Sequence, residues 1–99
     1  WTFLFRTIST IYESLEEYDR AINYYQQSIT VTKIIGDSQG EKRGLGDLGS
    51  IFYILGKHQQ AVECYEQSLA IAKKIKDSEG EKTILWNLKI IQRLLEDTE

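Results

Sequence analysis

The sequence predicts an all-α chain built as a solenoid of antiparallel helix hairpins. Three observations support this prediction: the chain resembles itself at an offset of 40 residues, its apolar residues recur at helical spacing, and one helix-start pattern occurs twice. Over residues 21–45, 12 of 25 positions are identical to the residue 40 positions later. Self-similarity at a fixed period of this size is typical of stacked helical units, which bury a continuous core against their neighbours.

Apolar residues spaced three and four apart predict five helices, over about residues 2–15, 19–35, 39–55, 58–75 and 78–97. Ser38 with Glu41, and Ser78 with Glu81, fit the capping box of a helix start. Gly56 follows the third helix, where the left-handed conformation is least costly for glycine. The helices are therefore expected to alternate in direction and to form hairpins.

Small residues recur where paired helices should touch. We expect close helix packing at Ala21, Ser28, Gly49, Ala61 and Ser68. A glycine inside a helix destabilises it by up to about 1 kcal/mol, so a close approach of two backbones is the expected reason for Gly49.

The predicted organisation is one domain over residues 1–99, with a first unit at 2–37, a second at 38–77 and a terminal or cut helix at 78–97. In that last helix, Lys89 and Gln92 replace Gly49 and Phe52 of the preceding unit. A lysine at a packing position indicates that no further helix docks closely there. Because the chain begins with Trp1, inside an apolar pattern, we interpret it as a fragment of a longer array.

Composition excludes several classes of function. A net charge of −3 argues against nucleic acid as a partner. No apolar run reaches the length of a membrane span and no signal-peptide pattern is present, so a cytoplasmic location without membrane association is expected. One cysteine agrees with a reducing compartment.

Enzyme signatures are also lacking, so no catalytic residue, metal site or cofactor is expected. His58 and Cys64 are interpreted as a packing residue and a helix-face residue. The carboxylates Glu16, Glu17, Glu79 and Glu81 are interpreted as a solvated turn and cap elements.

The middle unit resembles the tetratricopeptide repeat. The resemblance rests on these residues at their separations: Leu45, Leu48, Gly49, Phe52, Leu55, Gly56, Ala61, Tyr65 and Ser68. It implies a right-handed superhelix of about two and a half repeats. The 40-residue period and the connector from Gly36-Asp37 to Gly40-Glu41 resemble a longer variant found in bacterial and cyanobacterial arrays and in Pins-type scaffolds.

The resemblance also implies a peptide-binding groove lined by the first helix of each unit. Matched position by position, its candidate residues here are Arg6, Thr10, Arg43, Asp47, Ser50, Tyr53, Trp86 and Asn87. The carboxylate clamp of the chaperone-binding members is not expected, because Asp47 would repel a ligand carboxylate. Trp86 could equally be a ligand-stacking aromatic or a residue that lacks its next neighbour.

The leading functional hypothesis is a protein-interaction module, or scaffold, that binds a peptide segment of a partner in the concave groove. A second hypothesis is self-association through the unfinished ends of the array, which would make the chain a homo-oligomer. A third is a peptide-sensing domain of a bacterial regulator. The sequence names no partner.

Overall fold

The computed structural model describes residues 4, 5, 7, 8, 11 and 17–98. Within them lie four α-helices: α2 (Tyr18–Ile35), α3 (Ser38–Ile54), α4 (His58–Lys74) and α5 (Ser78–Thr98). These bounds agree closely with the last four predicted helices. The first predicted helix, at 2–15, falls mostly outside the described residues, so the expected count of five is reduced to four in the part described.

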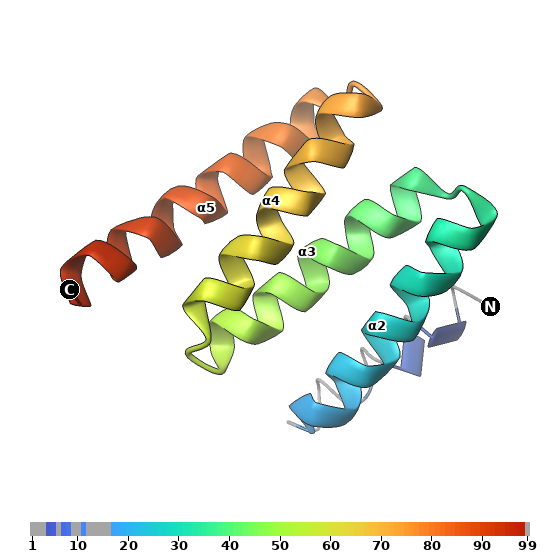
Figure 1. The fold of residues 1–99 in the computed structure, drawn as a ribbon, viewed down its shortest axis with the longest axis horizontal. Coiled ribbons are helices and arrows are strands. Elements are labelled where there is room, and N and C mark those ends of the chain that lie inside the picture. The colour runs from blue at the N-terminus through green and yellow to red at the C-terminus, as the bar shows by residue number, and fades with distance from the viewer. Residues whose placement is uncertain (1–3, 6, 9–10, 12–16, 99) are drawn as a thin grey trace.

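The helices lie side by side in chain order and alternate in direction (Figure 1). α3 packs against both α2 and α4, while α5 packs against α4. Because each helix packs mainly against the helix next to it in the sequence, the arrangement is the predicted solenoid of helix hairpins. No strand occurs among the described residues.

The small residues lie where the helices meet, as predicted. Ala21 and Ala61 are fully buried, and Ser28 and Ser68 are nearly so. Ser68 Oγ donates a hydrogen bond of 3.0 Å to the carbonyl oxygen of Lys42, which joins α4 to α3. A Cβ added at Gly49 would lie 3.1 Å from the Tyr65 ring, so glycine permits the close approach of these helices.

The helix starts differ from the prediction by one residue. Asp37, not Ser38, is the N-cap of α3, and its carboxylate accepts a 2.9 Å hydrogen bond from the N–H of Gly40. Asp77 accepts the same bond, at 3.0 Å, from Gly80 before α5. A side chain at Gly40 would collide with the Asp37 carboxylate, so the glycine of the connector makes room for the cap.

Three helices end in the same way. A residue with positive φ follows α2, α3 and α4: Gly36 at +74°, Gly56 at +76° and Lys76 at +60°. At each end this residue and the next donate hydrogen bonds to carbonyls of the last helical turn, as from Lys76 to Lys73 (3.2 Å) and from Asp77 to Ala72 (2.9 Å). This is the Schellman arrangement, and Gly56 has the predicted left-handed conformation.

The sequence predicts an apolar stripe of Leu85, Leu88, Ile91 and Leu95 on the last helix, and one of these residues departs from it. Ile84, Leu88 and Ile91 are buried, whereas Leu85, expected in the apolar stripe, is 38% exposed. Leu85 matches Leu45, which is buried because α3 has a helix on each side. Among the described residues the main packing partner of α5 is α4, and the side of α5 that carries Leu85, Lys89 and Gln92 is exposed.

Candidate functional site

Three adjoining cavities lie between α3 and α5, with α4 beneath them. We call them together the α3–α5 groove. Their volumes are about 530, 310 and 310 Å³, and each cavity shares lining residues with the next one along the groove. The groove is lined by Lys42, Arg43, Gly46, Asp47, Ser50, Tyr53, Ile54, Tyr65, Ser68, Gly80, Thr83, Ile84, Trp86, Asn87, Lys89, Ile90, Ile91, Gln92, Arg93, Leu94, Glu96 and Asp97.

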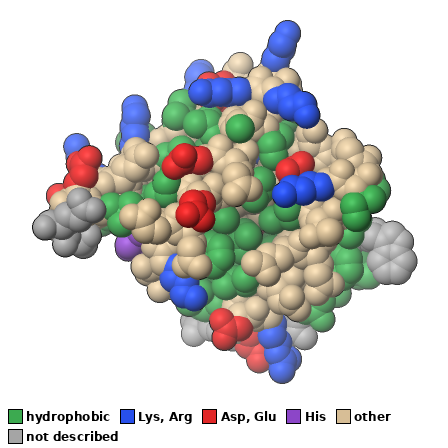
Figure 2. Space-filling model, in the orientation of Figure 1, with side chains coloured by type: hydrophobic (Ala, Val, Ile, Leu, Met, Phe, Trp, Pro, Cys, Tyr) green, Lys and Arg blue, Asp and Glu red, His purple; other side chains and the backbone are tan. Residues whose placement is uncertain are grey.

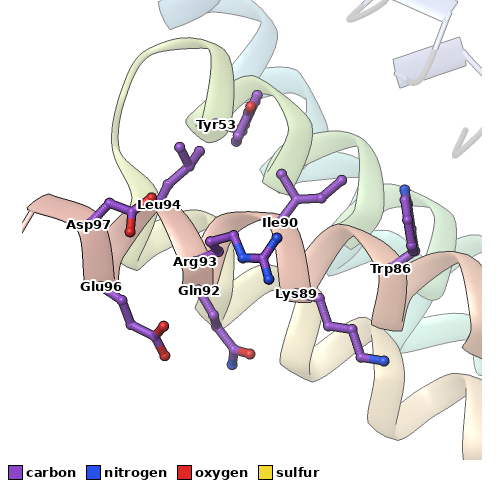
Figure 3. A pocket seen from close by; sticks show the side chains of 9 residues that line it. All are labelled: Tyr53, Trp86, Lys89, Ile90, Gln92, Arg93, Leu94, Glu96 and Asp97. Atoms are coloured by element: carbon purple, nitrogen blue, oxygen red, sulfur yellow. The ribbon is translucent and has the colours of Figure 1, made fainter.

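One end of the groove is apolar. In Figure 3, Trp86, Ile90 and Leu94 project from the side of α5 that lies toward Tyr53 of α3. Their spacing of four residues places them on one helix face. Trp86 is 68% exposed, and Tyr53 and Ile90 are 39% exposed. Large apolar side chains are thus held at the surface of a concavity.

The middle of the groove is polar. Ser50 Oγ lies 2.7 Å from Tyr65 Oη and donates a 3.1 Å hydrogen bond to the carbonyl oxygen of Gly46. Burial raises the pKa of the Tyr65 phenol, and the Asp47 carboxylate adds to the rise, while the bond to Ser50 opposes it. The phenol therefore remains protonated at neutral pH. Asn87 of α5 lines the same two cavities as Ser50 and Tyr65.

The other end of the groove carries charge from α3. Lys42 forms an ion pair with Asp77, which joins α3 to the start of α5. The bonds from Lys42 and the Gly80 N–H hold the pKa of the Asp77 carboxyl below its ordinary 3.8. Arg43 is exposed at this end, and Asp47 lies beside the polar middle.

The face shown in Figure 2 has acidic and basic side chains interspersed over it. That face presents no field of a single sign. None of the helices in the described ranges is long and apolar enough to cross a bilayer. In the same residues, no group of three or more His, Cys, Asp and Glu side chains is placed to hold a metal ion.

Six of the eight candidate residues line the groove: Arg43, Asp47, Ser50, Tyr53, Trp86 and Asn87. Arg6 and Thr10 lie outside the described residues. Most of the other lining residues were not among the candidates, and Ile54, Leu94 and Tyr65 are examples. Tyr65 belongs to the core, where it is 5% exposed, and it also lines two of the cavities. A tyrosine at a core position is itself a signal, since its hydroxyl needs a partner.

His58 and Cys64 have structural surroundings. The His58 ring packs edge-on against Tyr53, with centroids 5.7 Å apart, which confirms its predicted packing role. Cys64 is buried against α3 rather than lying on an open helix face. Burial, together with the nearby Glu63, raises the pKa of the Cys64 thiol to about 11, so the reactive thiolate is scarce at neutral pH.

Comparison with known families agrees with this architecture. A tetratricopeptide repeat profile matches residues 43–99, and a second profile of the same description matches residues 8–38. The chain belongs to the tetratricopeptide repeat family. No curated protein gave a match. Tetratricopeptide repeats are generally protein–protein interaction modules, and their fold is a non-catalytic interaction fold.

Proposed function

We propose that this tetratricopeptide repeat chain binds a peptide segment of a partner protein in the α3–α5 groove. The observation that carries the proposal is the exposure of Tyr53, Ile54, Trp86 and Ile90 within one concavity. Burying one large apolar side chain contributes about 1.5–3 kcal/mol, so a ligand that covers several of them gains appreciable affinity. Exposed apolar groups in a groove with a polar rim are typical of binding sites.

Polar groups beside the apolar end give the groove a means of orienting a ligand. Asn87 has both a donor and an acceptor in its side-chain amide, and Ser50 and Tyr65 carry hydroxyls. A peptide backbone presents the complementary N–H and C=O groups at every residue. The combination favours a polypeptide over a purely apolar ligand. The proposed setting is the cytoplasm, with the chain acting as a scaffold for its partner.

The test is quantitative affinity capture with the full-length protein and a groove variant carrying Arg43→Glu, Tyr53→Ala and Trp86→Ala. A matched control carries three exposed substitutions on α4: Gln60→Ala, Glu63→Ala and Gln67→Ala. We expect a partner that is lost by the groove variant and retained by the control. Circular dichroism verifies that both remain helical. If every captured protein binds both variants equally, the groove is not the binding site.

Self-association is a second candidate function. It is favoured by apolar side chains exposed toward the two ends of the array: Leu4 is 50% exposed, Ile11 54% and Leu85 38%. Light scattering after size exclusion, at several protein concentrations, tests it. A mass that rises with concentration, and that Leu85→Glu returns to that of a monomer, is the expected result. A strict monomer at high concentration would remove this candidate.

A further inference from the structure

The side of α5 that faces away from α4 carries exposed apolar side chains. Leu88 and Ile91 are buried, and the main packing partner of α5 is α4. At about 100° per residue around a helix, these two side chains are turned by about 200° and 140° from Trp86, which is 68% exposed. Ile90, which is 39% exposed, lies one turn along the helix from Trp86. The large apolar side chains on this side of α5 are therefore not covered by α4.

Two rows of side chains run along this side of α5, one on each side of Arg93 (Figure 3). The row toward α3 is apolar and the other row is polar and exposed; they consist of Trp86, Ile90 and Leu94, and of Lys89, Gln92 and Glu96. We call these six residues and Arg93 the outer face of α5. The polar row begins with a cation, Lys89, and ends with an anion, Glu96. The reversed row is therefore complementary in charge to the row itself.

A surface that complements its own reverse fits a twofold dimer, in which both copies contribute the same surface to the interface. A twofold axis perpendicular to α5 sets each row beside the same row of a second copy, which runs in the opposite direction. Lys89 of each copy then faces Glu96 of the other, and Ile90 lies beside Ile90. Parallel helices would instead oppose Lys89 to Lys89 and Glu96 to Glu96. Charged residues beside a helix contact set its orientation in this way, so the antiparallel arrangement is favoured.

One alignment of the two helices serves both rows. The polar row is centred on Gln92 and the apolar row on Ile90, which is two residues earlier in α5. This offset is about 3 Å along the helix axis. Packed helices commonly cross at about 20°, which accommodates such an offset across the width of the contact. The charge pairs and the apolar contacts can therefore form together.

We propose that two copies of this chain associate through the outer face of α5, with their α5 helices antiparallel about a twofold axis that passes beside Ile90 and Gln92. This contact lies on a different surface from the ends of the array. The inference does not rest on the proposed function. A second copy seated here covers Trp86 and Ile90, so it competes with a ligand for the apolar end of the α3–α5 groove.

The experiment is sedimentation equilibrium of the full-length protein at several concentrations and low ionic strength. The test variants are Lys89→Glu, Glu96→Lys and the double variant that carries both changes. Two exposed residues on other helices provide controls that change the net charge by the same amounts: Lys33→Glu on α2 and Glu63→Lys on α4. Circular dichroism and melting temperatures verify that every variant remains folded.

The wild-type mass should rise with concentration toward that of a dimer. Each single test variant should weaken the dimer by about 5-fold or more, because two attractive charge pairs become repulsive. The double variant should return to the wild-type dissociation constant, since it exchanges the two charges. An equimolar mixture of Lys89→Glu and Glu96→Lys should also dimerise as wild type does, because every pair across the mixed interface is then of opposite charge. Both control variants should behave as wild type.

Three results would overturn the inference. The first is a wild-type protein that is monomeric at every concentration, which would leave the proposed function intact. The second is a dimer that both single test variants form as tightly as wild type. The third is a double variant as weak as the single ones, which would show that Lys89 and Glu96 do not face each other. A dimer that Leu85→Glu abolishes, and that the charge variants leave unchanged, would assign self-association to the ends of the array instead.

Discussion

Replacing Lys76 with glycine should stabilise the protein. Lys76 is the residue with positive φ after α4, at +60°, where glycines occupy the matching places after α2 and α3. It is the single non-glycine residue with positive φ in the described part of the chain. The left-handed conformation costs an L-residue about 1–2 kcal/mol, a cost that glycine does not have. Lys76→Gly removes that strain.

Two opposing effects reduce the gain. Glycine gives the unfolded chain more conformational freedom, which costs about 0.4–1 kcal/mol. The substitution also removes a positive charge near the C-terminus of α4, where a cation contributes about 0.3 kcal/mol when exposed. The hydrogen bonds from residue 76 to Lys73 and from Asp77 to Ala72 are backbone bonds and persist. The expected net gain is about 0.5 kcal/mol, or about 2–4 °C in melting temperature for a domain of this size.

The assay is thermal unfolding followed by circular dichroism, with urea unfolding as a second measure. Lys76→Gln is the matched control, because it removes the charge but keeps the Cβ, and it should not gain stability. Gly36→Ala is the converse variant: an added Cβ there meets nothing within 4 Å, so any loss reports the φ of +74° alone. If Lys76→Gly is no more stable than Lys76→Gln while Gly36→Ala loses stability, the strain assigned to Lys76 is absent.

Four further predictions concern packing and capping. Ala61 is fully buried, so Ala61→Leu should cost about 1–3 kcal/mol through overpacking, whereas Ala70→Leu on the exposed side of α4 should be near neutral. Gly46→Ala should stabilise by about 0.5–1 kcal/mol because an added Cβ meets nothing within 4 Å. Gly49→Ala should destabilise because its Cβ would crowd a buried ring at 3.1 Å. The pKa of Asp77 is lower in the folded protein than its ordinary value. The ionised carboxylate therefore stabilises the fold at pH values above the ordinary pKa, and this contribution is lost as pH falls through the folded-state pKa. Asp77→Asn should therefore lower stability at neutral pH and reduce the loss seen on acidification below about pH 4.

Melting temperatures of these variants, with a pH series for the last, provide the measurements. If Ala61→Leu and Ala70→Leu lower the melting temperature equally, Ala61 is not at a tight contact. Stabilisation by Gly49→Ala would indicate that the helix pair has room for a methyl group. Parallel stability curves for wild type and Asp77→Asn between neutral and acidic pH would contradict the proposed role of the carboxylate.

The repeat pattern predicted the helices and most of their contacts, because apolar spacing and small residues both report on helix packing. It could not predict the one-residue shift of the N-cap. Asp37 and Ser38 are both good cap residues, and both recur 40 residues later, so periodicity does not separate them. The burial of Leu85 was predicted wrongly for another reason. Helical spacing identifies an apolar position but not whether a neighbouring helix covers it, and α5 has one main packing partner where α3 has two.

The lining of the groove was predictable where a whole residue faces it: the match to the tetratricopeptide repeat put Tyr53 and Trp86 among the candidates. It was less predictable where one residue serves two environments. Tyr65 is a core residue that also lines the groove. A periodic pattern assigns a residue to one face and does not resolve its two ends. The short contact between Ser50 and Tyr65 likewise joins residues of two helices and is contained in no sequence pattern.

A comparison within the chain separates the residues that build the fold from those that shape the groove. At an offset of 40 residues, Leu48 and Ile51 of α3 recur unchanged in α5, where both copies are buried. At the same offset, Gly46 corresponds to Trp86 and Ser50 to Ile90, and all four line the groove. Packing therefore constrains the first set of positions and leaves the second free to differ. At these two matched positions α3 presents small or polar residues, and α5 presents large apolar ones. Under the proposed function, a ligand that contacts both pairs of residues would meet a small or polar surface on one side and a large apolar surface on the other.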